Sequence, residues 1–245
     1  MNTFASDELV LVSPRYLAGG GMNKINDVIN PLVHLFTWPY KHNPRTGRLD
    51  IDSPCGSVFL DFDPNRQDGV WWTIAHHEPY WRIEFSRQTP SEAIASVTQA
   101  LPQLLGDRRN ADRIPLATES VAHLAKSSGW EVSSILSGAV WTSPDGHCTV
   151  EHSTDPMHPW RIEHSVYDGF DTHWSATFTP EVPERLVAQF FTHLATTTPV
   201  ERLFRDVPYF VQKLDEVLIT PVSHAGVNPH VHHAGAQLGR AARHR

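Results

Sequence analysis

Cysteine is scarce in this 245-residue sequence, which contains only Cys55 and Cys148 and no Cys-x-x-Cys spacing. Two cysteines are too few for the disulfide framework of a small secreted scaffold. The 16 histidines do not show the Cys/His spacing of a structural zinc site either. We therefore expect two reduced, partly buried thiols and no metal site.

Long apolar runs are also missing. No stretch approaches the roughly 20 apolar residues that a membrane helix needs. The first eight residues, Met-Asn-Thr-Phe-Ala-Ser-Asp-Glu, lack the basic and apolar regions of a signal peptide. These absences predict a cytoplasmic protein without a membrane partner.

The common catalytic motifs are absent, because the sequence contains no Gly-x-Ser-x-Gly, no phosphate-binding loop and no His-Glu-x-x-His. The run Gly19-Gly20-Gly21 precedes a predicted helix, where a glycine loop can hold an anion. It lacks the Lys-Ser/Thr of a phosphate loop, so a flexible loop is the better interpretation. The sequence therefore predicts a protein that is not an enzyme, with no catalytic residues and no cofactor.

Basic charge is in deficit, since 20 Lys and Arg residues stand against 27 Asp and Glu residues and the formal net charge is −7. This balance disfavours a protein that coats duplex DNA with its whole surface. A local basic patch remains compatible with it. Tryptophan, in contrast, is abundant, with 8 residues.

The chain contains an internal duplication, which an ordered series of matches reveals. Ser53-Pro54-Cys55-Gly56 matches Ser143-Pro144-Asp145-Gly146, and Trp72-Thr73-Ile74-Ala75-His76 matches Trp160-Arg161-Ile162-Glu163-His164. A single match would be noise, whereas an ordered series is typical of a duplication. The other matches are Val33-His34-Leu35 with Ala122-His123-Leu124, Trp38 with Trp130, Trp81 and Phe85 with Trp174 and Phe178, and Pro90 with Pro183.

Each copy is predicted to form a short helix, four antiparallel strands and a closing helix. Apolar residues alternate along the strands, as at Trp81, Ile83 and Phe85, and this period of two is typical of a half-buried strand. Thr89 and Pro90 are typical of a helix start. We expect four-stranded sheets over 45–87 and 138–179, leading helices over 22–36 and 118–127, and closing helices over 90–104 and 182–196. The second copy has one surplus strand pattern, so residues 131–143 should form a single hairpin or a bent strand.

The predicted fold class is α+β, with two (α)ββββα repeats packed as a pseudo-twofold unit and an added C-terminal helix. The first repeat covers 13–105, the second 117–196 and the C-terminal helix 198–219. Residues 221–245 are rich in His and Arg and should form a disordered tail. One parity of the strands should supply the buried core: Trp72, Trp81, Phe85, Trp160, Trp174 and Phe178.

These segments resemble the SPDY repeat, a domain of unknown function found in tandem in streptomycete proteins. The resemblance covers 13–105 well and 117–196 more loosely, and it implies no catalytic residues. Its motifs are Arg15-Tyr16-Leu17-Ala18-Gly19-Gly20-Gly21, the two Ser-Pro-x-Gly turns, Trp71-Trp72-Thr73-Ile74 and Phe85-Ser86-Arg87-Gln88-Thr89-Pro90.

A second similarity concerns topology alone. Four antiparallel strands followed by a helix, given twice, are similar to the purine-rich-element-binding and whirly-type modules. In those modules two repeats intertwine and bind single-stranded nucleic acid. Because fold does not fix function, this similarity implies only a candidate ligand.

The leading hypothesis is therefore non-catalytic binding of single-stranded or distorted nucleic acid by the sheet face opposite the helices. On the predicted parity this face carries Phe59, Trp71, Arg82 and Arg161, whose rings stack bases and whose guanidinium groups hold phosphates. Acidic residues on the same face favour a solvated surface with cross-strand Arg–Glu pairs instead; they are Asp61, Asp63, Glu84 and Glu163.

The alternative is a protein-interaction or assembly module that does not bind nucleic acid. The predicted C-terminal helix carries too many apolar residues to remain in water, so it must pack against the repeats or against a second copy of the chain. We therefore expect a homodimer whose interface includes Val207, Phe210 and Leu214.

Overall fold

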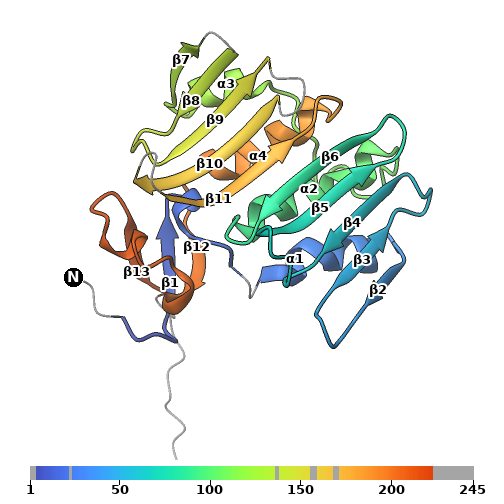
Figure 1. The fold of residues 1–245 in the computed structure, drawn as a ribbon, viewed down its shortest axis with the longest axis horizontal. Helices are drawn as coiled ribbons and strands as arrows, with labels where there is room; N and C mark the ends of the chain where they lie inside the picture. The colour runs from blue at the N-terminus through green and yellow to red at the C-terminus, as the bar shows by residue number, and fades with distance from the viewer. Residues whose placement is uncertain (1–3, 22–23, 136–137, 155–158, 168–170, 223–245) are drawn as a thin grey trace, which may run out of the picture.

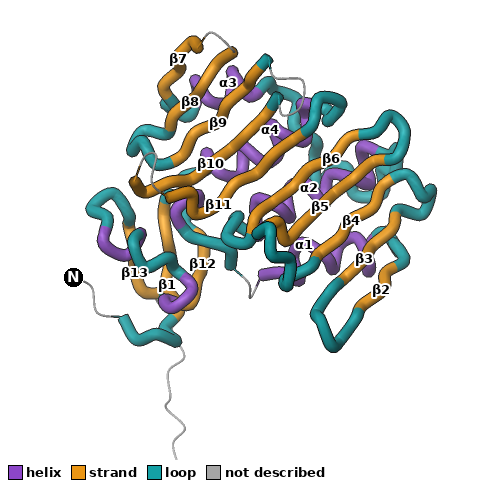
Figure 2. Tube along the Cα trace, in the orientation of Figure 1, coloured by secondary structure: helices purple, strands orange, loops and turns teal. Residues whose placement is uncertain are grey.

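A computed structural model describes residues 4–21, 24–135, 138–154, 159–167 and 171–222. Within these residues, ten antiparallel strands form one sheet in the order β2-β3-β4-β5-β6-β11-β10-β9-β8-β7 (Figures 1 and 2). The α+β class is confirmed. The strands are β2 (Tyr40–His42), β3 (Leu49–Asp52), β4 (Val58–Phe62), β5 (Val70–His76), β6 (Trp81–Ser86), β7 (Glu131–Ile135), β8 (Gly138–Thr142), β9 (Cys148–Ser153), β10 (Trp160–Tyr167) and β11 (Asp171–Phe178).

Helices cover one face of this sheet and lie behind it in Figure 1. The helix α2 packs against α4 and α1, and α3 packs against α4. Their bounds are α1 (Ile25–Asn30), which continues into a π-helical turn over Pro31–Leu35, α2 (Ser91–Leu104), α3 (Val121–Ser127) and α4 (Glu184–Ala195). The predicted start of α2 is wrong in detail, because Pro90 is the N-cap and Thr89 donates its hydroxyl to the Ser175 carbonyl instead.

The two halves of the sheet meet along β6 and β11 with a register that respects the duplication. The sequence matches Phe85 with Phe178, and so Ile83 with Ala176. In the sheet, Phe85 pairs with Ala176 and Ile83 pairs with Phe178. Exchanging the two copies therefore maps this ladder onto itself, which places a pseudo-twofold axis at the Glu84–Thr177 pair.

The expected layout of two separate four-stranded sheets is wrong on two counts. Each repeat contributes five strands, and the two sets are joined edge to edge in a single sheet. The surplus pattern over 131–143 is the hairpin β7–β8, and its counterpart β2–β3 exists in the first repeat. The strand β2 was missed because its three residues are all exposed and show no apolar alternation.

The predicted aromatic core is confirmed. All six aromatic residues are at least 93% buried on the helix side of the sheet. Phe190 of α4 completes this cluster at the junction, with its ring centroid 5.3 Å from that of Phe85 and 5.9 Å from that of Phe178. The joint between the repeats is thus a packed aromatic core as well as a ladder of hydrogen bonds.

The predicted C-terminal helix over 198–219 is wrong. This segment forms β12 (Val200–Leu203), two short 3₁₀ turns over Phe204–Asp206 and Val211–Lys213, and β13 (Leu218–Pro221). Both strands pair with β1 (Leu9–Ser13) in a small sheet of order β12-β1-β13. Pro208 and the β-branched residues at 200, 207 and 211 favour this extended path over a helix.

We call residues 9–21 and 200–222 the terminal module. Within it Val207 is buried, whereas Phe210 is exposed and Leu214 is half-buried, so the three residues do not form one apolar stripe. The helix that motivated the homodimer therefore does not exist, and the homodimer itself stays a prediction. The tail expected from 221 onward begins inside β13, and its remainder lies outside the described residues.

Candidate nucleic-acid interface

The face of the sheet opposite the helices is open, and the structure places the predicted binding residues on it. Phe59 is 42% exposed there, and Arg82 and Arg161 alternate with the buried positions of β6 and β10. Trp71 projects from a β-bulge in β5, at the register shift between Val70 and Trp72. A bulge of this kind re-aims one side chain without ending the strand.

The middle of this open face is electrically neutralised. The Arg82 guanidinium lies 2.5 Å from the Glu84 carboxylate, and the Arg161 guanidinium lies 2.6 Å from that of Glu163. Arg48, which precedes β3, forms ion pairs with Asp50 and with Asp61 on the neighbouring strand β4. The competing interpretation of a face with Arg–Glu pairs holds for Arg82 and Arg161, but each of these pairs lies along one strand and not across two strands as predicted.

One end of the open face differs, because two adjoining hollows share Arg87 and Gln88. The first, which we call the β-sheet hollow, has a volume of about 480 Å³ and is lined by Gly69, Ser86, Arg87, Gln88, Arg161, Glu163, Thr172, His173, Trp174 and Ser175. The second, the module hollow, has a volume of about 290 Å³ and is lined by Gly21, Trp71, Arg87, Gln88 and residues 205–209. Both repeats and the terminal module contribute to this end.

Arg87 is the cation at the centre of this site. Its guanidinium carbon lies 5.1 Å from the centroid of the Trp71 ring, within the range of a cation–π contact. Among the described residues no carboxylate lies within ion-pair distance of it. Arg87 therefore retains positive charge that the arginines in the middle of the face share with glutamate.

Aromatic rings continue across the terminal module beside these hollows. Lys213 lies 4.0 Å from the centroid of the Tyr209 ring, and Phe210 stands edge-on to Tyr167 with centroids 5.9 Å apart. Tyr209 is 63% exposed and Tyr167 is 55% exposed. We call Trp71, Tyr167, Tyr209 and Phe210 the aromatic rim.

The glycine run sets the spacing of this site. Gly20 donates its N–H to the Gln88 side chain, and a Cβ at Gly20 would stand 3.0 Å from the Arg87 carbonyl oxygen. A Cβ at Gly19, whose φ is +73°, would stand 2.9 Å from the Pro208 ring. These glycines allow the terminal module to approach the end of β6 closely, so their role in this structure is close packing rather than anion binding.

A buried ion pair holds the terminal module against α2. Arg202 is fully buried and donates to both oxygens of Glu92, at 2.5 and 2.7 Å, and to the Ala18 and Gly19 carbonyls. Burial alone would raise the pKa of Glu92, but the Arg202 guanidinium outweighs burial and holds that pKa below its usual range. The pair is therefore charged at neutral pH and ties β12 of the terminal module to α2.

His164 lies next to the β-sheet hollow and is fully buried. Its Nδ1 is 2.9 Å from the His147 carbonyl oxygen, and its ring centroid is 5.2 Å from that of His173. Burial lowers the pKa of His164 to about 4, so its ring is neutral at pH 7. It contributes no positive charge to the site.

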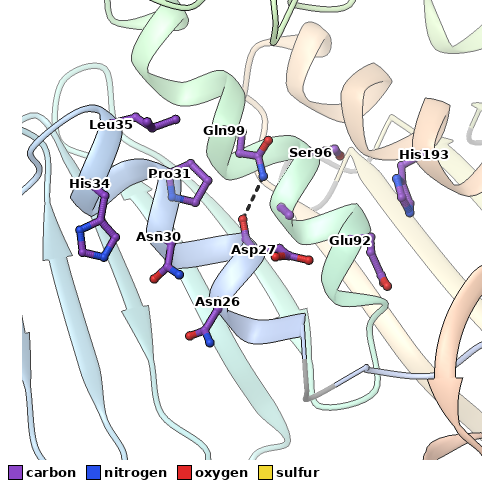
Figure 3. Close-up of a pocket in the computed structure, with 11 residues that line it drawn as sticks. Asn26, Asp27, Asn30, Pro31, His34, Leu35, Glu92, Ser96, Gln99 and His193 are labelled. Atoms are coloured by element: carbon purple, nitrogen blue, oxygen red, sulfur yellow. Dashed lines mark hydrogen bonds between the residues drawn. The ribbon is translucent and has the colours of Figure 1, made fainter. Parts of the chain in front are cut away.

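A third hollow of about 540 Å³ lies on the helix side, between α1 and α2 (Figure 3). Asp27, Asn30, His34, Glu92, Gln99 and His193 line it, and Gln99 donates to the Asp27 carbonyl. No Lys or Arg is among its lining residues, and burial lowers the pKa of His193 to about 4. Its charge is therefore unsuited to a polyanion.

Sequence reasoning found part of the site and missed part of it. Trp71 and Arg161 line the hollows, whereas Phe59 and Arg82 lie on the open face outside them. Arg87 was missed because strand parity groups it with the buried residues of its strand, whereas β6 ends at Ser86 and Arg87 is exposed. Tyr209 and Lys213 were missed because their segment was predicted to be a helix. No described group of three or more His, Cys, Asp and Glu side chains is arranged to hold a metal ion. No helix in the described part of the chain is long and apolar enough to cross a membrane.

We compared the chain with known proteins and found a match to one protein family. The family model of SPDY, described as a domain of unknown function (DUF317), matches residues 52–103 and 142–200. Each matched segment spans the last three strands of one repeat and its closing helix, so the structural repeat extends further than the matched unit. No curated protein and no solved structure matches the chain. The similarity to whirly-type modules accordingly stays a prediction.

Proposed function

We propose that this chain, which belongs to the family of tandem SPDY-repeat proteins, binds single-stranded nucleic acid at the end of its open sheet face. The observation that supports this most is Arg87, a cation that has no carboxylate partner among the described residues, stacks on Trp71 and lines both hollows. Arg guanidinium planes and aromatic rings are the groups on which proteins stack unpaired bases, and the guanidinium also attracts phosphate.

The aromatic rim favours a single strand over a duplex. Trp71 and Tyr209 line the module hollow, and Tyr209 is followed directly by the exposed ring of Phe210. Rings of this kind gain stacking energy only from bases that are splayed out, which a duplex keeps paired and covered. The overall charge of −7 restricts the attraction to this local patch, so the expected site is short.

A second candidate, a protein-binding module, is favoured by the same exposed rings. Tyr209, Tyr167 and Phe210 are between 41% and 63% exposed, and exposed aromatic residues are enriched at protein interfaces. The partner in that case would be another protein, or a second copy of the chain in a homodimer. The two candidates differ in their dependence on Arg87 and on salt.

Titration of a fluorescent single-stranded oligonucleotide of about 20 nucleotides tests the proposal, with anisotropy read at about 50 and 200 mM salt. The wild type should bind at low salt with a clear salt slope. Arg87→Ala should weaken binding about tenfold and flatten the slope, because a phosphate contact is lost. Arg82→Ala on the same face is the matched control and should leave both quantities unchanged.

Tyr209→Ala provides a second test with a different signature. Loss of one stacking ring should weaken binding about fivefold or more while the salt slope stays the same. Absence of binding by the wild type at low salt would overturn the proposal in favour of the protein-binding module. Equal losses for Arg82→Ala and Arg87→Ala would overturn the assignment to this end of the face.

A further inference from the structure

We infer that the β-sheet hollow selects guanine among the bases of a bound single strand, an inference that rests on the proposed function. The pair formed by Arg161 and Glu163 lines this hollow, and Glu163 is the one carboxylate among its described lining residues. Arg87 is a second cation in this lining, and the remaining polar side chains come from Ser86, Gln88, Thr172, His173 and Ser175. The volume of about 480 Å³ lies in the range of sites that enclose a small molecule.

The geometry of the pair leaves one acceptor free. Arg161 donates from one terminal nitrogen to Oε1 of Glu163 at 2.6 Å. The second oxygen, Oε2, has no hydrogen-bond partner among the described residues. The hollow therefore presents a carboxylate acceptor with guanidinium donors directly beside it.

Guanine is the base whose edge complements this arrangement. Its Watson–Crick edge carries two adjacent donors, N1–H and the N2 amino group, with the O6 acceptor next to N1. Oε2 accepts from one of these donors and the second lone pair of Oε1 accepts from the other, while a further N–H of the Arg161 guanidinium donates to O6. Thymine and uracil flank their single N–H with two carbonyl oxygens, which a carboxylate repels.

Adenine and cytosine are also poorer ligands for the pair. Each carries one amino donor next to a bare ring nitrogen on its Watson–Crick edge, so a carboxylate that accepts from the amino group faces a ring lone pair instead of a second N–H. The Glu163 carboxylate and the Arg161 guanidinium should therefore bind guanine more tightly than the other bases.

The Arg82–Glu84 pair shows that the pair alone is not the site. It has the same Arg-x-Glu spacing and lies on the same face, and its guanidinium nitrogen is 2.5 Å from the carboxylate oxygen. Neither Arg82 nor Glu84 is among the described residues that line the β-sheet hollow or the module hollow. Glu84→Gln is therefore the matched control for Glu163→Gln, because it makes the same chemical change outside the lining of the β-sheet hollow.

The test compares an all-thymine oligonucleotide with one that carries guanine at a few central positions, and with matched adenine and cytosine versions. The wild type should bind the guanine oligonucleotide about tenfold more tightly than the others, the value of one well-made pair of hydrogen bonds to a base. Glu163→Gln and Arg161→Ala should each abolish this preference. Glu84→Gln should preserve it.

The outcomes separate this inference from the function on which it rests. Equal affinity of the wild type for all four oligonucleotides overturns guanine selection while nucleic-acid binding stands. A preference that survives in Glu163→Gln also overturns it, because another group would then read the base. Failure of every oligonucleotide to bind overturns the function and the inference together. Thermal melting of each variant shows that the fold is intact.

Discussion

The two repeats place equivalent residues at the same register positions, but the burial of those residues differs. His76 and His164 occupy equivalent positions, since His76 pairs with Trp81 and His164 pairs with Trp174 across the adjacent strand. His76 is half-buried and its Nδ1 is 2.8 Å from the Pro79 carbonyl oxygen, whereas His164 is fully buried. Burial of an equivalent residue in one copy alone shows that the surroundings, not the repeat, determine its chemistry.

The two Ser-Pro-x-Gly turns explain where the difference arises. In each turn the serine hydroxyl accepts the same backbone N–H, from Val58 in one copy and from Cys148 in the other. The third turn residue differs, because Cys55 is exposed whereas Asp145 accepts a hydrogen bond from the Tyr16 hydroxyl at 2.8 Å. The terminal module therefore contacts the turn of the second repeat, whereas Cys55 in the equivalent turn of the first repeat is exposed.

The largest expected effect comes from the matched core tryptophans. Trp81→Ala and Trp174→Ala should each lower the free energy of unfolding by roughly 3–5 kcal/mol, because each empties a large buried site. Trp174→Ala should cost more, since the Trp174 indole N–H also donates to the Tyr16 carbonyl in the terminal module. Chemical denaturation measures both values. Equal costs would mean that the module adds nothing to the second repeat.

Acid should destabilise the protein through its buried histidines. The pKa of His164 and that of His193 are each lowered to about 4, chiefly by burial, from an ordinary value of 6.5. A base with a depressed folded-state pKa makes the unfolded state bind more protons below pH 6.5. The stabilisation is complete above that pH and is lost as the pH falls toward 4, by up to about 3 kcal/mol for each ring.

Urea denaturation across pH 4 to 7 measures this loss. Replacing His164 with Phe should flatten the acid limb of the stability curve and leave the share that His193 contributes. An unchanged acid limb in that variant would show that His164 is not the titrating group. The comparison isolates the chemistry of the second repeat, where the His164 ring is fully buried.

Much of the fold could be predicted from the sequence, because the duplication shows the pattern of each repeated element twice. The alternation at Trp81, Ile83 and Phe85 and its copy at Trp174 and Phe178 predict buried strand faces, and these residues are buried. Short exposed strands such as β2 escape prediction, because no apolar period marks them. The terminal module escapes because its strands pair with β1, at the other end of the chain, and a single apolar segment does not reveal its partner.

The candidate site was only half predictable for the same reason. Strand parity places Arg161 on the open face, and the structure agrees. Parity does not show that Arg161 and Arg82 each have a glutamate within 2.6 Å, nor that Arg87 lacks one. Tyr209 and Lys213 reach the site only because the terminal module folds back on the sheet, which is a tertiary effect. The sequence therefore predicts the open face, but it does not predict that the candidate site lies at the end of the face where the two hollows meet.

A smaller effect should separate the two turns. Asp145→Asn weakens the hydrogen bond to the Tyr16 hydroxyl and should cost about 1–2 kcal/mol, because a half-satisfied buried hydroxyl remains. The matched change Cys55→Ser in the first repeat should cost less than about 0.5 kcal/mol, since that side chain is exposed. Thermal melting measures both. Equal losses would contradict the docking of the module on the second turn.

The smallest stability effects belong to the two Arg–Glu pairs, and they sharpen the comparison of the repeats most directly. Arg82→Ala and Arg161→Ala remove partly exposed ion pairs of similar geometry, so each should change the free energy of unfolding by no more than about 1 kcal/mol. Their effects on binding should differ, because Arg161 lines the β-sheet hollow and Arg82 is not among the described residues that line it. Arg161→Ala should lower affinity for a guanine-containing single strand about tenfold, and Arg82→Ala should leave it unchanged. The same titration reads both variants, and equal affinities would show that the two halves of the open face are functionally equivalent.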